Sequence, residues 1–192
     1  LNGKGDESFY RWIQQDCDVR LLLKTYAVNV TMGMWDDYWN NCNNYYLYIT
    51  THDRYDYKVY MIPFDYDNTL GSTLSIGNQS DAGRQNPFNW GNNTNLFIYR
   101  LLKNPEFREI YKEELLKLVG EDEGLFCYSA SLGRIRKWQE GIGPYVSNDT
   151  GEDMVIEDKP APWGNHGEYR LLDPGENNFF KVRSAAILNY CK

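Results

Sequence analysis

The sequence predicts an α+β fold in which helices dominate and one small antiparallel hairpin supplies the sheet. Apolar side chains recur at helical spacing through residues 7–34 and again in the second half of the chain. Residues 45–50 (YYLYIT) and 58–64 (KVYMIPF) alternate large side chains as strands do, and a polar turn joins them. After residue 71 no run of Val and Ile suggests a larger sheet.

The helices are predicted from apolar periodicity and from the residues at their ends. In the stretch 104–120, Asn104 is a typical N-cap, Pro105 suits the first helical position and Gly120 suits the end. Loops are expected where Asp, Asn, Gly and Ser accumulate, at 34–44 and 72–94, and at 141–178, where no period is visible. The remaining helices are predicted at 96–103, at 125–140 and in the closing stretch NNFFKVRSAAILNY.

Length and charge limit the possible functions. The 192 residues suffice for one domain with a sizeable core, and 42% of them are hydrophobic. The formal net charge of −7 argues against a reader of the nucleic-acid backbone, which needs a basic face. It does not argue against a nucleotide held through a metal ion, because the ion brings its own positive charge. No apolar run approaches the ~20 residues of a membrane-spanning helix, so no membrane span is expected.

Four cysteines are spread along the chain: Cys17, Cys42, Cys127 and Cys191. They do not form the CxxC spacing typical of zinc sites, so a zinc site is not expected. They allow three disulfide pairings, among which the sequence does not choose. Buried free thiols are the simplest interpretation.

Two pairs of acidic residues flank the predicted hairpin. Asp65 and Asp67 follow its second strand in the stretch VYMIPFDYDNTLG, and Asp36 and Asp37 precede its first strand. In an antiparallel hairpin these points lie at the same end, so four carboxylates are expected within reach of one site. Asp also ends strands and opens turns, but an unpaired carboxylate at the end of an apolar strand is costly. A divalent cation shared with phosphate oxygens would relieve the repulsion between the acids.

Asp36 and Asp37 come directly after Trp35, near the end of the predicted N-terminal helices. One interpretation is an ordinary turn at a helix end. An acid is poorly placed there against the helix dipole, which favours a functional reason for its presence. One of the two is then a candidate for the base that accepts a hydroxyl proton in phosphoryl transfer.

Several motifs together resemble the spore coat protein H (CotH) kinase family. They are MWDDYWNNCNNYYLY followed by KVYMIPFDYDNTLG, then NLFIYRLLKNPEFREIYKEEL and the closing FFKVRSAAIL. The resemblance covers essentially the whole chain in order. Phe64 stands where the family usually has Trp, and Leu70 where it usually has Phe; both keep the apolar character.

The resemblance implies an atypical protein-kinase-like fold that transfers the γ-phosphoryl group of ATP to Ser or Thr hydroxyls of a protein substrate. Asp36 matches the catalytic base, Asp65 the metal-binding aspartate and Asn44 a second metal ligand. Asp67 is a further ligand or a brace for its loop, and Asp37 replaces Asp36 if the alignment is shifted by one residue. The implied cofactors are ATP and Mg²⁺, with Mn²⁺ or Ca²⁺ as alternative ions.

On the same resemblance, residues 1–192 form one domain, mainly the helical C-terminal lobe with its metal-binding hairpin. The lobe that grips the nucleotide, with its phosphate-binding lysine, is expected to precede Leu1. An extracytoplasmic location, at the cell surface or in a spore coat, is expected for a bacterial member of the family.

Two other functions are compatible with parts of the sequence. The stretch DYDNTL also matches the first motif of haloacid-dehalogenase-like phosphatases, in which Asp65 would be the nucleophile and Asp67 the acid/base. Those enzymes need a parallel sheet, which the later sequence does not suggest. Alternatively, the six Trp and sixteen Tyr could form a carbohydrate-binding surface, with calcium held by the acids. The isolated His52 and His166 are more typical of surface residues than of metal ligands.

Overall fold

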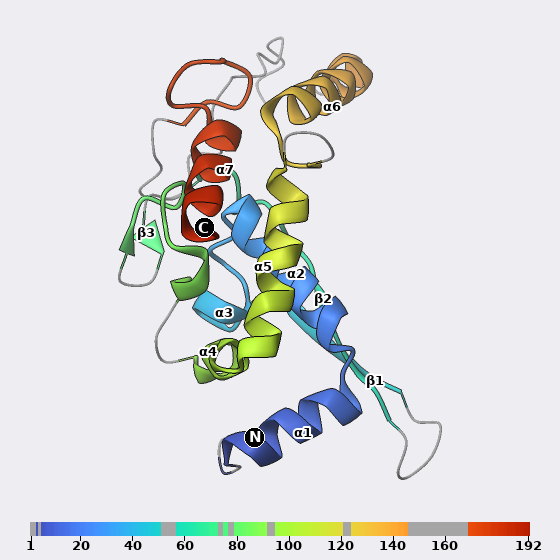
Figure 1. Cartoon of the computed structure of the whole chain (residues 1–192). Helices are drawn as coiled ribbons and strands as arrows, with labels where there is room; N and C mark the ends of the chain where they lie inside the picture. Colours follow the sequence, from blue (N-terminus) through green and yellow to red (C-terminus); the bar gives the residue numbers. More distant parts are fainter. Residues whose placement is uncertain are drawn as a thin grey trace.

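The computed structural model describes residues 3, 5–50, 57–72, 75–76, 79–91, 95–120, 124–145 and 169–192. These residues are mostly helical, with small antiparallel sheets, which confirms the predicted α+β class (Figure 1). Within those ranges, no helix is both long and apolar enough for a membrane crossing. His52, His166 and most of the predicted loop at 141–178 lie outside the described residues.

The predicted helices and strands are found close to their expected positions. The stretch 7–34 forms two helices, α1 (Asp6–Asp16) and α2 (Val19–Met32). The loop predicted at 34–44 contains one helical turn, and the loop at 72–94 contains two very short strands and a 3-10 turn. After α2 the elements are α3 (Tyr38–Asn41), β1 (Tyr45–Ile49), β2 (Val59–Pro63), β3 (Ser75–Ile76), β4 (Gln79–Ser80), η1 (Pro87–Asn89), α4 (Leu96–Lys103), α5 (Pro105–Val119), α6 (Tyr128–Ile142), η2 (Gly143–Tyr145) and α7 (Phe179–Tyr190).

The core lies where α2 packs along α5, and α7 packs against both (Figure 1). The apolar residues whose helical spacing predicts α2 also form its buried face. Full burial of one large apolar side chain stabilises a fold by roughly 1.5–3 kcal/mol, so this seam is a main source of stability. The fully buried side chains of the seam are Leu23, Tyr26, Ala27 and Val30 of α2 and Tyr111 and Leu115 of α5.

β1 and β2 form the predicted antiparallel hairpin, with Leu47 opposite Met61 and Tyr46 opposite Ile62. The face that carries Leu47 and Met61 is turned toward α1, α2 and α4, with which it lines a small cavity. Tyr46 and Ile62 of the other face are exposed, and Leu47 of the first face is itself 55% exposed, so the hairpin packs on the helices only in part. The hairpin is therefore held to the helical body by one face only.

Arg183 joins α7 to two other segments. Its side chain is fully buried, and its Nε donates a hydrogen bond to the Val30 carbonyl oxygen at 3.0 Å. Its Nη1 donates to the carbonyl oxygen of Gln85 at 2.5 Å, and its guanidinium carbon lies 4.9 Å from the centre of the Trp90 ring. Burial lowers the pKa of Arg183 to about 10, so the side chain stays charged at neutral pH. One cation thus connects α7, the end of α2 and the segment before η1.

All four cysteines are free thiols. Cys17 and Cys191 are buried, as predicted. The prediction of burial is wrong for Cys42, which is exposed in the turn after α3, and for Cys127, which is partly exposed at the start of α6.

Two asparagine N-caps, on α5 and α7, are predicted to differ in their effect on stability. Asn104 is partly exposed and accepts two backbone hydrogen bonds in the first turn of α5. Asn178 is fully buried, caps α7, and also donates from Nδ2 to the carbonyl oxygens of Leu171 and Asp173, at 3.1 and 2.8 Å. We expect Asn104→Ala to lower the free energy of unfolding by about 1 kcal/mol, and Asn178→Ala by about 2–4 kcal/mol. Urea denaturation measures both, and equal losses would contradict the role given to the buried amide.

Candidate functional site

The chain leaves α2 in a direction set by Gly33. Its φ of +70° is left-handed, and a Cβ there would lie 2.8 Å from the Phe179 ring of α7. The N–H of Met34 then donates back to the Asn29 carbonyl oxygen at 2.9 Å. This turn starts the loop, residues 34–44, that carries Asp36 and Asp37.

Asp37 has a structural position. It is 1% exposed and is the N-cap of α3, where its Oδ1 accepts from the Asn40 N–H at 3.0 Å. Its Oδ2 accepts from Asn29 Nδ2, also at 3.0 Å. Burial raises the pKa of Asp37 to about 6; hydrogen bonds from Asn29 and the backbone oppose the shift, and the neighbouring Asp36 adds to it. A carboxylate so enclosed cannot meet a substrate hydroxyl unless the loop opens.

Asp36 lies next to it but is partly exposed and is surrounded by amides. Asn41 Nδ2 donates to Asp36 Oδ1 at 2.8 Å. Asn43 and Asn44 donate to Asp36 Oδ2 at 3.2 and 2.9 Å. Asn44 Nδ2 also donates to the backbone oxygen of Asp36, at 3.0 Å. The carboxylate is thus held in one orientation, and within the described part of the chain no donor to the Asn44 side-chain oxygen is found.

The hairpin brings Asp65 to the same end as Asn44. The N–H of Phe64 donates to the Asn44 carbonyl oxygen at 3.0 Å, which extends the strand pairing by one step. Asn44 (φ 52°) and Asp65 (φ 58°) are both left-handed, a conformation that Asn and Asp adopt more readily than most side chains. These two bends end the ladder, and Asp65 follows it with an exposed side chain.

The loop after Asp65 is fastened to α2. Tyr66 donates from its hydroxyl to Asn29 Oδ1 at 2.7 Å, and Leu70 N–H donates to the Met32 carbonyl oxygen at 2.8 Å. Asp67 is exposed and accepts from the side chain of Asn68 at 3.0 Å. Asn29 therefore contacts both loops of the site, through Asp37 on one side and Tyr66 on the other.

Asp37 differs from the other acids of the expected cluster, because its side chain is buried and accepts hydrogen bonds from Asn29 and Asn40. Across the described ranges, no three His, Cys, Asp or Glu side chains are grouped so that they could hold a metal ion. Asp36 and Asn44 are in contact, and Asp65 follows the residue paired with Asn44. The roles predicted for Asp36, Asp37, Asn44, Asp65 and Asp67 stay predictions.

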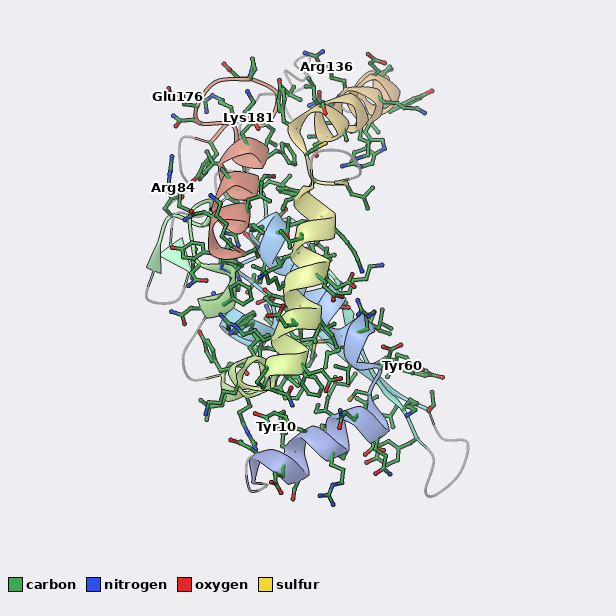
Figure 2. The ribbon with its side chains drawn as sticks, viewed as in Figure 1. Tyr10, Tyr60, Arg84, Arg136, Glu176 and Lys181 are labelled. Carbon is green, nitrogen blue, oxygen red and sulfur yellow. The ribbon has the colours of Figure 1, made fainter. Side chains whose placement is uncertain are left out.

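Sequence reasoning missed two features of the site. The run NNCNN was interpreted as a turn, although Asn41 and Asn43 use their side chains to hold Asp36. The second is an aromatic row on the hairpin, exposed at Tyr46, Tyr48 and Phe64. The rings of Tyr46 and Phe64 stack at 4.8 Å, and Tyr48 lies beside the partly buried Tyr60 (labelled in Figure 2). The alternation in YYLYIT, together with the strand register, could have predicted that one face is aromatic.

The architecture does not favour the phosphatase alternative. The described strands form two separate two-stranded antiparallel sheets, whereas that class of enzyme needs a parallel sheet with its nucleophile at a strand end.

A helix-rich α+β domain with an Asp and an Asn before one strand and an Asp after the next is the arrangement expected of a protein-kinase-like catalytic lobe. The comparison with protein families agrees with this class. The family model described as "CotH kinase protein" matches residues 1–170. The chain therefore belongs to the CotH kinase family. The resemblance inferred from the motifs is thereby confirmed. A search of curated proteins finds no match.

The raised pKa of Asp37 predicts a specific pH dependence of stability. Between pH 3.8, the ordinary pKa, and about 6, the native state binds more protons than the unfolded state, so this group lowers the free energy of unfolding as pH rises. The shift corresponds to a change on the order of 3 kcal/mol. Asp37→Asn keeps an oxygen for the Asn40 N–H and does not titrate. Its stability relative to the wild type should therefore increase between pH 4 and 7.

Urea denaturation at several pH values measures this difference. A pH-independent difference between Asp37→Asn and the wild type would show that Asp37 ionises normally.

Proposed function

We propose that this protein is a metal-dependent kinase that transfers the γ-phosphoryl group of ATP to Ser or Thr hydroxyls of a protein substrate. Membership of the CotH kinase family supports the general class. The observation that carries the finer proposal is the contact between Asp36 and Asn44 at the hairpin end where Asp65 follows β2. This combines a candidate base with oxygen ligands for a phosphate-bound cation.

Asp36 is proposed to accept, or at least orient, the proton of the substrate hydroxyl. Its carboxylate is partly exposed, as a base that meets a protein substrate must be. The amides of Asn41, Asn43 and Asn44 fix its direction, so little reorientation is needed when a hydroxyl arrives. Asp37 lacks this access because it is 1% exposed.

Asp65 and Asn44 are the proposed cation ligands, with Asp67 as a third. Their donor atoms are oxygens, which suit Mg²⁺, Mn²⁺ and Ca²⁺. Within the described part of the chain, no donor is found to the Asp65 carboxylate or to the side-chain oxygen of Asn44, whose amide nitrogen donates to Asp36. When bound, such a cation neutralises charge on the phosphates. The few protein ligands fit a shell that phosphate oxygens and water complete.

The exposed aromatic row supports ATP as the phosphate donor. Tyr46 and Phe64 lie at the acidic end of the hairpin, and Tyr48 and Tyr60 continue the row away from it. Stacking of a nucleobase on an aromatic side chain stabilises binding by about 1–3 kcal/mol. A nucleotide whose phosphates lie near Asp65 would have an apolar surface within reach of its base.

The proposed cation site predicts a metal-dependent rise in melting temperature. A ligand that binds only the native state stabilises it by about 2.7 kcal/mol at a hundredfold excess over Kd. We expect millimolar Mg²⁺ or Mn²⁺ to raise the melting temperature of the wild type, and Asp65→Asn to lose the shift. Glu140→Gln, an exposed carboxylate on α6, should keep it. Equal shifts in all three proteins would remove the site from consideration.

The proposed division between the two adjacent acids predicts opposite kinetic results. Asp36→Asn should lower turnover by roughly 10²–10⁴, the usual contribution of a general base, with ATP affinity nearly unchanged. Asp37→Asn should keep activity because Asp37 supports the loop without meeting the substrate. The measurements are transfer of labelled γ-phosphate to a serine-rich protein and calorimetric ATP binding. Loss of turnover in Asp37→Asn with none in Asp36→Asn would reassign the base.

A further inference from the structure

A cavity of about 340 Å³ lies away from the hairpin, between the end of α2, the end of α5, and the helices α6 and α7. Met32 and Leu70 line one side, Phe180 another, and Ile135 and Trp138 of α6 a third. Small-molecule sites commonly have volumes of about 300–1,000 Å³. At roughly 30 Å³ for a water-sized group, this cavity has room for about eleven non-hydrogen atoms, close to the number in a ten-carbon carboxylate.

The α6 wall of the cavity stands partly away from the body. Figure 1 shows α6 beyond the end of α5, and its described links to the α7 region are few. Tyr128 donates from its hydroxyl to the Leu172 carbonyl oxygen at 2.9 Å, and its ring lies 4.9 Å from Lys181 Nζ. At the rim, Leu125 and Trp138 are 64% and 62% exposed despite their apolar side chains. A ligand that entered here would cover them.

Polar groups are built into this otherwise apolar lining. Thr31 is 1% exposed, and its hydroxyl has no hydrogen-bond partner in the described part of the chain. Buried polar atoms are normally paired, so an unpaired one at a cavity wall indicates a missing partner. Ser131 is 2% exposed, and its hydroxyl lies 3.3 Å from Arg134 Nη2, which also donates to the Leu125 carbonyl oxygen.

Three basic residues lie on α6, the helix that forms one wall of the cavity. Arg134, Arg136 and Lys137 follow one another closely on α6, whereas the chain carries a formal net charge of −7. Arg134 is the member of this group that lines the cavity. A guanidinium attracts an oxyanion such as a carboxylate, because its N–H groups form charge-assisted hydrogen bonds to the oxyanion's oxygens.

We propose that this cavity binds a free amphipathic carboxylate of about ten carbon atoms, with its chain among the apolar walls and its carboxylate at Arg134. The cavity also borders the loop that follows Asp65. Leu70 lies five residues after Asp65, lines the cavity, and is hydrogen-bonded through its N–H to Met32, which lines it too. An occupied cavity would hold this loop in place. The binding itself does not depend on the proposed kinase activity.

Calorimetric titration of the full chain with decanoate tests the proposal, with decanol and phosphatidylglycerol vesicles as comparison ligands. We expect saturable binding of one decanoate per chain. Arg134→Gln should weaken it at least tenfold, and Ile135→Trp, which fills the cavity, should abolish it. Arg136→Gln is the matched control, since Arg136 is exposed on the same helix (labelled in Figure 2) and does not line the cavity. Circular dichroism of each variant checks that it is folded.

Three outcomes would overturn the proposal. The first is absent or non-saturating decanoate binding to the wild type. The second is equal affinity for decanol and decanoate with no effect of Arg134→Gln, because the charge would then play no part. The third is vesicle binding without decanoate binding, which would make the surface of α6 a membrane contact.

Discussion

The last turn of α2 is the constraint on which the candidate site depends. The final carbonyl groups of a helix have no partner within it, and the helix end carries partial negative charge. Here those carbonyls bind three separate segments: the loop before α3, the loop after β2 and the C-terminal helix α7. Their donors are the backbone N–H groups of Gly33, Met34 and Leu70 and the buried guanidinium of Arg183. The carbonyl groups at the end of α2 thus hold together parts of the chain that are far apart in sequence.

The same turn explains why two adjacent acids differ so much. Asn29 is 3% exposed. Its Nδ2 donates a hydrogen bond to Asp37, and its Oδ1 accepts one from the Tyr66 hydroxyl. Asp37 is thereby drawn into the protein as a cap and connection between loops. Asp36 faces outward, where the amides of Asn41, Asn43 and Asn44 hold it. Asp37 therefore supports the loops of the site, whereas Asp36 keeps access to solvent.

The hairpin has a related asymmetry. One face packs toward the helices, while the other exposes aromatic rings beside the acidic end. Exposed apolar surface beside polar ligand atoms is typical of a site that awaits a ligand or another protein surface. The proposed nucleotide would use both properties at once, because it joins an apolar base to charged phosphates.

The sequence by itself determined the helices, the hairpin and the family. Apolar periodicity located α2 and α7, and Asn104, Pro105 and Gly120 marked the ends of α5, because these signals act over a few neighbouring residues. The hairpin likewise followed from alternation in two short strands, and its antiparallel pairing brought Asn44 and Asp65 to one end.

Only the tertiary structure decided which of the acids is accessible. Asp36 and Asp37 are the same residue type in adjacent positions, so no local pattern separates them. The difference comes from Asn29, eight residues before Asp37, and from Tyr66, which reaches Asn29 from another loop. The same holds for Arg183, whose partners Val30 and Gln85 are 153 and 98 residues away. Burial and hydrogen bonding between distant segments exist only once the chain has packed, and they set the charge and exposure of each side chain.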